Sequence, residues 1–378
     1  MMALLRKVFA PLGLATLAWL LLEGGQWLKG APYGLLPGSL LKVLGLVPLL
    51  PALVVQFWCE LHLKWQPPLL PLGWLLFAFY IGMLRTARTR LTIPLKPGRR
   101  AFLAGGGVVA VSGYGVARAY PAPGLLRFPL PLPDLPPSLD GLRVVLVSDL
   151  HRGPAIGQAY LLSVVEQVNA LKPDLILMPG DFISQSSVYY GDIAAALSRL
   201  RPTIASLATL GNHDHWEGET EALACLEKAG VVALHNRSVV LTPDRRLSET
   251  AETGLGLAGV DDLGAGRPDL AAALRGSGPD LPTLLMSHNP DMAEHPAALA
   301  SSQRVDLQLS GHTHGGQVVL PGVGPVVSGS RFGLKYLAGW AQGPRWPVFV
   351  TRGVGASLLP LRVGAAPEIV LFELRRRD

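Results

Sequence analysis

The first 118 residues constrain the fold most, because they contain four apolar stretches in series with no charged residue inside them. Each stretch has only 15–16 residues, short of the ~20 that a spanning helix needs, but flanking Trp and Tyr side chains can extend it into the interface. A buried helical core is the alternative, although so apolar a segment would be hard to keep soluble. We expect an α-helical transmembrane region of about four helices over residues 1–118. The stretches are residues 8–22, 43–58, 69–84 and 101–116.

The net charge of +6 is unevenly distributed along the chain. Residues 1–140 hold 13 Lys and Arg against 4 Asp and Glu, or +9, whereas residues 141–378 hold 20 against 23, or −3. Positive charge beside apolar stretches indicates membrane topology and not a nucleic-acid footprint, so no nucleic-acid partner is expected. The 49% of hydrophobic residues also excludes a disordered chain.

The loop between the third and fourth stretches predicts the orientation of the chain. Residues 85–100 contain six basic residues and no acidic one, which favours a cytoplasmic position. The fourth helix would then deliver the rest of the chain to the extracytoplasmic side, although Arg6 and Lys7 favour the opposite arrangement. Arg99-Arg100 before an apolar run looks like a twin-arginine export signal, or else adds two stop-transfer charges.

A proline-rich segment separates the two halves of the sequence. Seven prolines fall between Tyr120 and Pro137, so we interpret residues 119–140 as an extended linker. The two cysteines, Cys59 and Cys225, are far apart in unlike sequence, which argues against a disulfide framework or a cysteine-based zinc site.

Residues 141–378 alternate apolar strand-like runs with helical patterns, which predicts an α/β domain with largely parallel strands covered by helices. A run at 238–241 should pair with one at 254–260 through a polar turn. Expected helices cover residues 161–171, 192–200 and 217–228, and expected buried strands cover 143–147, 175–178, 203–209, 283–287 and 305–309.

Metal-capable residues follow the ends of those five strands. Because ligands bind where the carboxyl ends of such strands converge, positions far apart in sequence can form one pocket. Within the first and last groups, i and i+2 positions of an extended strand end would point the same way. The groups are Asp149-Leu-His151, Gly180-Asp181, Gly211-Asn212-His213-Asp214, His288 and Gly311-His312-Thr-His314.

This ordered series resembles the calcineurin-like metallophosphoesterase superfamily, and the resemblance covers about residues 141–378. The tail at residues 353–362 and 367–374 is similar to a bacterial subgroup with many membrane-anchored or exported members. The resemblance implies a metallophosphoesterase-type two-sheet sandwich flanked by helices. It also implies that one metal ion is held by Asp149, His151 and His314, a second by Asn212, His288 and His312, and that Asp181 bridges them.

Such a donor set suits chemistry at phosphorus. Two divalent cations can stabilise the attacking and leaving oxygens of an in-line displacement, and nitrogen and oxygen ligands without thiolates suit Mn, Fe or Zn. The resemblance places His213 against the phosphate, where it would steady the transition state or protonate the leaving oxygen. Asp214 is expected either to orient that ring or to be a surface carboxylate.

The sequence therefore predicts a multi-pass protein of the bacterial cytoplasmic membrane with an extracytoplasmic phosphoesterase domain. The expected reaction is hydrolysis of a phosphodiester or phosphomonoester by a metal-bridged hydroxide, on a phosphorylated small molecule or a lipid-linked or envelope substrate. Two alternatives stay open. One is a cytoplasm-facing pyrophosphatase of a nucleotide-linked lipid A precursor, and the other is a non-catalytic metal-dependent binding or sensor module.

Overall fold

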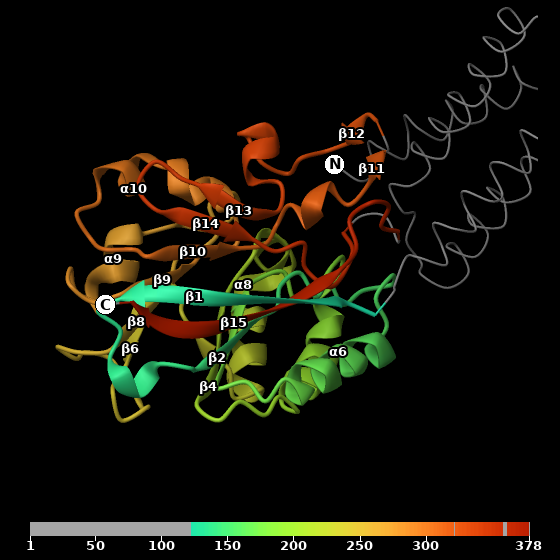
Figure 1. The fold of residues 1–378 in the computed structure, drawn as a ribbon. Coiled ribbons are helices and arrows are strands. Elements are labelled where there is room, and N and C mark those ends of the chain that lie inside the picture. The colour runs from blue at the N-terminus through green and yellow to red at the C-terminus, as the bar shows by residue number, and fades with distance from the viewer. Residues whose placement is uncertain (1–121, 321, 358–360, 378) are drawn as a thin grey trace, which may run out of the picture. The chain divides into compact units, whose positions relative to one another are not determined.

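The computed structural model describes residues 122–320, 322–357 and 361–377 (Figure 1). The predicted transmembrane region, residues 1–118, lies outside the described residues. Among the residues that are described, no helix combines the length and hydropathy needed to cross a membrane.

The first of two large sheets has six strands in the order β1-β15-β2-β3-β4-β5. Its strands β2 to β5 run parallel to one another, while β15 runs antiparallel to β2 and parallel to β1. Strands β2 to β5 therefore all end at one edge of the sheet. The six strands are β1 (Gly124–Pro133), β2 (Arg143–Leu146), β3 (Leu175–Pro179), β4 (Ala205–Thr209), β5 (Val232–Ala233) and β15 (Glu368–Arg377).

The second sheet has seven strands in the order β13-β14-β10-β9-β8-β6-β7. Its central strands β14, β10, β9 and β8 are parallel, and the predicted antiparallel pairing of residues 238–241 with 254–260 is confirmed by β6 and β8. The strands are β6 (Arg237–Leu241), β7 (Leu247–Ser248), β8 (Leu255–Gly259), β9 (Thr283–Met286), β10 (Leu307–Ser310), β13 (Gly339–Gln342) and β14 (Pro347–Val350). A separate hairpin pairs β11 (Val319–Leu320) with β12 (Gly324–Pro325).

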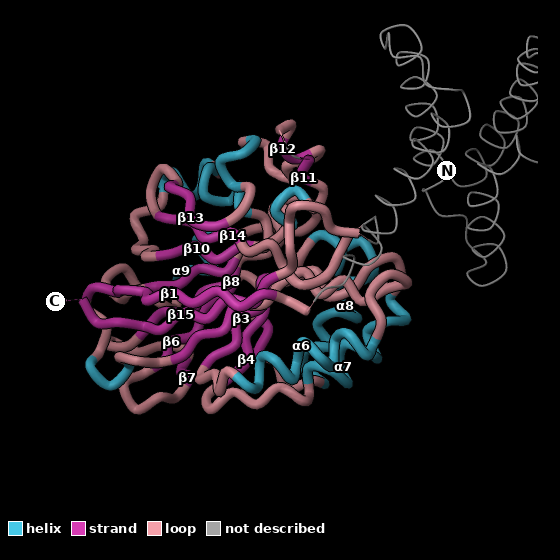
Figure 2. Tube along the Cα trace, turned by 45° about the vertical axis from the view of Figure 1, so that its right-hand side comes forward, coloured by secondary structure: helices cyan, strands magenta, loops and turns pink. Residues whose placement is uncertain are grey.

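The two sheets pack against each other, with helices outside them (Figure 2). Alternate residues of β2 show the reason: Val144 and Leu146 lie in the core between the sheets, whereas Val145 packs against the helical layer. This is the two-sided burial expected of a strand with helices on one face. The helices of the first sheet are α6 (Gln158–Ala170), α7 (Tyr190–Leu197) and α8 (Asn212–Lys228), and those of the second are α9 (Leu270–Arg275) and α10 (Pro296–Ala300).

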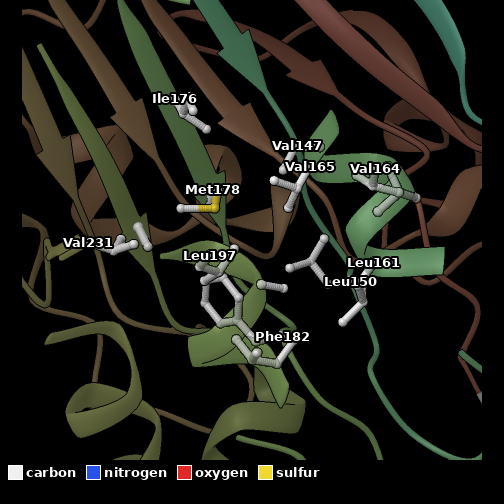
Figure 3. Close-up of a cluster of buried hydrophobic side chains, with 14 of the residues drawn as sticks. Val147, Leu150, Leu161, Val164, Val165, Ile176, Met178, Phe182, Leu197 and Val231 are labelled. Atoms are coloured by element: carbon white, nitrogen blue, oxygen red, sulfur yellow. The ribbon is translucent and has the colours of Figure 1, made fainter. Parts of the chain in front are cut away.

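The helical layer of the first sheet forms a continuous apolar core with the strands beneath it (Figure 3). Ile176 and Met178 of β3 contact this layer, and Leu161 and Val164 supply the inner face of α6. Burying such side chains contributes about 1.5–3 kcal/mol each relative to exposure, so the strand ends that follow are held on a rigid base.

Part of the predicted linker belongs to the first sheet. Residues 124–133 form the edge strand β1, paired with β15 along its whole length. The Pro-Leu-Pro-Leu-Pro run at 129–133 fits an edge, because its leucines are buried while its prolines, which lack an N–H, are exposed. The linker interpretation is therefore wrong for this stretch, although its extended conformation is as expected. The other predicted domain boundaries stay predictions.

Candidate metal centre

The predicted site residues lie directly after parallel strands of both sheets. Asp149 and His151 follow β2, Asp181 follows β3, and Asn212 follows β4. From the second sheet, His288 follows β9, and His312 and His314 follow β10. The structure brings all seven side chains together.

The backbone at these positions is not the extended strand end that the sequence suggested. Asp149, His151, Asp181, His312 and His314 all have positive φ, between 47° and 72°. Left-handed backbone costs a non-glycine residue about 1–3 kcal/mol, and it persists where packing on all sides enforces it. The side chains converge because of these turns, so the expectation of i and i+2 alternation along an extended strand is wrong.

Three side chains form the first half of the cluster. The Nε2 atoms of His151 and His314 lie 2.9 Å apart. Oδ1 of Asp149 lies 3.4 Å from Nε2 of His314 and 3.8 Å from Nε2 of His151. All three side chains are buried.

Three other side chains form the second half. Nδ1 of His312 lies 2.9 Å from Oδ1 of Asn212 and 3.3 Å from Nε2 of His288. His288 is fully buried, and its Nδ1–H donates to the carbonyl of Pro179 at 2.7 Å. In a neutral ring this bond leaves the Nε2 lone pair pointing into the cluster.

Asp181 joins the two halves. Its Oδ2 lies 3.4 Å from Nε2 of His151 and 3.2 Å from Nε2 of His288. Its Oδ1 accepts a hydrogen bond from the backbone N–H of His213 at 2.9 Å. Gly211 leaves room for this carboxylate, since a Cβ at that position would collide with it.

The electrostatics of the cluster are those of a cation site. Burial would raise the pKa of Asp149 and Asp181, but the neighbouring histidines, His314 and His288 foremost, hold both well below the usual range. Burial would lower the pKa of His288, yet Asp181 raises it to about 10. The two buried carboxylates are therefore ionised, and their negative charge stabilises a cation bound between the side chains of the cluster.

The donor set fits divalent metal ions. Carboxylate, imidazole and amide donors converge from both sheets without a thiolate, and such a set suits Mn, Fe or Zn. Among the described residues, three groups place one ligand atom each within 4.8 Å of one another. They are Asp149, His151 and His314; His151, Asp181 and His213; and Asp149, Asp181 and His288.

One neighbour of the first half is unusual for a metal site. The buried Arg362 places Nη2 3.0 Å from Nδ1 of His314, and a guanidinium can only donate. Nδ1 of His314 must therefore accept this hydrogen bond, and a neutral ring then carries its proton on Nε2. That proton would have to leave before Nε2 could bind an ion. Arg362 also donates to the carbonyls of Gly355 and Arg352, so it ties His314 to the loop that follows β14.

Asp214 does not occupy either position expected for it. It is fully buried, and its carboxylate accepts the backbone N–H groups of Asp181, Phe182 and Gly211 at 2.9–3.0 Å. Burial and the charge of Asp181 raise its pKa to about 7. The surface interpretation is wrong, and the carboxylate connects the ends of β3 and β4 instead of orienting the His213 ring.

His213 lies at the open side of the cluster. It stands in the first turn of α8, which begins at Asn212 and not at the predicted residue 217. Its ring centroid is 4.8 Å from those of His151 and Trp216, and Trp216 is 66% exposed. Burial lowers the pKa of His213 to about 4, so the ring is neutral at pH 7.

Two residues that the sequence did not single out support His213. Oγ of Ser357 lies 3.2 Å from Nε2 of His213. The Gln317 side chain fixes the Ser357 backbone by accepting its N–H at 2.9 Å and donating to its carbonyl at 2.7 Å. Serine and glutamine in glycine-rich segments carry no distinctive signal, and only the fold brings them beside His213.

Comparison with known proteins identifies the family. Residues 142–316 match the sequence model of the calcineurin-like phosphoesterases. The uncharacterized metallophosphoesterase YkuE of Bacillus subtilis is 33% identical over 74% of this chain and 98% of its own length. Phosphodiesterase YaeI of Escherichia coli is 32% identical over 61% of this chain and 82% of its own length.

A third relative is a zebrafish (Danio rerio) transmembrane protein with a metallophosphoesterase domain. It is 32% identical over 70% of this chain, and the match spans only 60% of the relative's own length. With the family match and the clustered aspartates and histidines, these relatives confirm the resemblance seen in the motifs. The chain belongs to the calcineurin-like phosphoesterase family and is a metal-dependent phosphoesterase.

Proposed function

We propose that this protein hydrolyses a phosphodiester with two divalent cations held by the seven clustered side chains. The observation that carries the proposal is the position of Asp181, whose Oδ2 lies 3.2–3.4 Å from a ring nitrogen of each half. A carboxylate oxygen between two donor groups is what a pair of ions sharing one ligand requires.

Each half supplies the remaining donors for one ion. Asp149, His151 and His314 would hold the first, and Asn212, His288 and His312 the second. Ions held there would polarise the phosphoryl group and lower the pKa of a water nucleophile. The neutral amide of Asn212 keeps the site more positive than a third carboxylate would, which favours a phosphate anion.

His213 is the proposed catalytic residue that holds no ion of its own. Its backbone N–H is anchored on Asp181, and its ring stands between the buried cluster and the exposed Trp216. A neutral ring can donate one N–H to a phosphoryl or leaving oxygen without adding a repulsive charge near the cations.

The substrate class is proposed on two grounds. The related Escherichia coli protein is named a phosphodiesterase, which favours a diester over a monoester. The apolar sequence before residue 118 and the name of the zebrafish relative favour attachment to a membrane, and hence a lipid-linked or envelope phosphodiester. The extracytoplasmic orientation is tested by a topology reporter fused after Asp378.

The hydrolysis of bis(p-nitrophenyl) phosphate by the detergent-solubilised full chain with added Mn²⁺ tests the reaction. We expect turnover that Asp181→Asn and His213→Ala abolish or strongly reduce. Asp280→Asn makes the same chemical change at an exposed position and should leave the rate unchanged. A wild-type protein inert toward monoesters, diesters and pyrophosphates would contradict the proposal.

A further inference from the structure

The segment after the His312-Thr-His314 motif carries an unusual amount of exposed apolar surface. Eleven large hydrophobic side chains are exposed among the described residues, and six of them lie between positions 320 and 334. Val323, Val326 and Val327 are 64–80% exposed. We call this surface the apolar rim, and it consists of Leu320, Val323, Val326, Val327, Phe332 and Leu334.

The apolar rim lies against the metal centre. A Cβ on Gly316, two residues after His314, would collide with Pro325, and one on Gly329 would press on the backbone of Thr313. Thr313 Oγ1 also donates to the carbonyl of Leu337 at 2.7 Å. The segment that carries the rim is therefore folded directly onto the loop between two proposed metal ligands.

The chain enters the described domain at the same end. Val319 N–H donates to Val363 O at 2.8 Å, and four residues further on, Pro367 O accepts the N–H of Gly124, the first residue of β1. Gly124 is eight positions after residue 116, the end of the last predicted membrane stretch, and a connection of that length can span at most about 28 Å. The rim thus lies at the end of the domain that the sequence ties to the membrane.

The charge of this region distinguishes it from the rest of the domain. No Asp or Glu occurs from residue 307 to residue 367, although residues 141–378 as a whole carry −3. Five basic residues fall in that interval, and Arg331 and Arg345 are exposed, whereas the exposed Lys335 is paired with Glu294 and the Arg331 backbone N–H donates to Asp291. Exposed valine and leucine beside basic residues suit an anionic bilayer, where apolar groups enter the interface and cations meet the headgroups.

We propose that the apolar rim docks on the surface of an anionic phospholipid bilayer and so presents the metal centre to phosphoesters in that surface. The proposal rests on the proposed function for the substrate and deepens it. A bilayer accounts for the exposed apolar side chains and for the exposed Arg331 among them, and the last predicted membrane stretch ends only eight positions before Gly124.

Fluorescence of the reconstituted full chain tests the docking. In a Cys59→Ser background, Val323→Cys is labelled with an environment-sensitive dye, and Leu299→Cys is the control. Leu299 is also exposed but lies in α10, which leads into the amino end of β10, away from the site. In phosphatidylglycerol and phosphatidylcholine vesicles we expect a blue shift and quenching by doxyl lipids at position 323 alone.

Two results would overturn the docking proposal. One is equal emission and equal quenching at the two positions. The other is a shielded probe at position 323 that no lipid-borne quencher reaches, which would indicate a protein contact.

An activity comparison separates this inference from the proposed function. Val323→Asp with Val327→Asp should lower hydrolysis of a vesicle-borne phosphodiester at least about tenfold and leave hydrolysis of soluble bis(p-nitrophenyl) phosphate within about twofold. Leu299→Asp should change neither. If both rates are unchanged by the rim variant, the rim does not dock, whereas a wild type inactive on the soluble ester contradicts the proposed function itself.

Discussion

The two halves of the metal cluster differ in how tightly the protein encloses them. In the first half, Asp149, His151 and His314 are at most 5% exposed, and the outer ring nitrogens lie against Ser184 and Arg362. In the second half, Asn212 and His288 are buried as well, but His312 is partly exposed. The first half is therefore closed on all three of its side chains, whereas the second half is open to solvent at His312.

The enclosure follows from the positions of the elements. The first half lies under the loop after β14, whose Gly353 fits against Asp149 without room for a Cβ. The second half begins at the amino end of α8, where Asn212 is held by a helix start and not by a covering loop. We therefore expect the first half to bind its ion more tightly, and the following experiments test that difference.

Loss of the shared ligand should have the largest effect. Asp181→Asn removes the one carboxylate that lies between both halves, so we expect at least a ~10³-fold lower kcat and weaker binding at both ion positions. Elemental analysis and calorimetric Mn²⁺ titration measure binding independently of turnover. Full occupancy of two ions in this variant would show that Asp181 does not join the halves.

Single-ligand variants compare the halves directly. His151→Ala and His312→Ala each remove one imidazole, and each should weaken the ion in its own half by at least ~10²-fold while the other half stays filled. His295→Ala, a histidine outside the cluster, is the control. If either variant loses both ions, the halves do not bind independently.

A smaller effect is expected for Ser357, which contacts the proposed catalytic ring and no predicted ligand. Ser357→Ala should slow hydrolysis about tenfold, and more for esters with poor leaving groups, because these depend most on protonation. Ser357→Thr keeps the hydroxyl and should restore most of the rate. In a His213→Ala background the Ser357→Ala change should have no further effect, and additive losses would rule out action through His213.

The smallest effect is expected for the ion pair between α8 and the residues after β8, where Nε2 of His215 lies 2.5 Å from Oδ1 of Asp261. Burial lowers the pKa of His215, but Asp261 outweighs it and raises the pKa above the usual value. Burial raises the pKa of Asp261, but His215 and backbone N–H groups hold it below the usual value.

The pH dependence of stability follows from these two shifts. The His215 contribution is present below its unfolded pKa and is lost as the pH rises through the raised folded pKa. The Asp261 contribution is lost as the pH falls through its lowered folded pKa. In the wild type we expect the free energy of unfolding to fall by about 1 kcal/mol at alkaline pH, and this decrease should be absent in His215→Asn. Thermal unfolding at several pH values measures it. If His215→Asn shows the same alkaline decrease in stability as the wild type, the His215–Asp261 pair does not contribute to folding stability.

Much of the fold was predictable because strand and helix periodicity is local. The alternation of apolar runs indicated parallel strands with polar residues at their ends, and β2, β3, β4, β9 and β10 lie where those runs were expected. The linker interpretation failed at β1 because a Pro-Leu repeat has the period of a strand as well as the composition of a linker. Only pairing with β15, more than 230 residues away, distinguishes the two.

Position along the chain could not reveal which site residues contact one another. Asp214 follows His213 directly, yet its carboxylate accepts N–H groups from two strand ends and does not meet the ring. Ser357 is 144 positions from His213 and contacts it. Such contacts depend on the order of the strands and on the turns after them.

The sequence by itself determined the donor chemistry, because nitrogen and oxygen ligands after buried strands identify a metal site whatever the order of those strands. The resemblance already implied that Asp181 stands between the halves. Only the fold shows the left-handed turns at Asp149 and Asp181, the contact of Ser357 with His213, and the exposed apolar side chains after the His312-Thr-His314 motif. The physical reason is that these features are distances between segments of two packed sheets, and no local pattern of residues specifies such a distance.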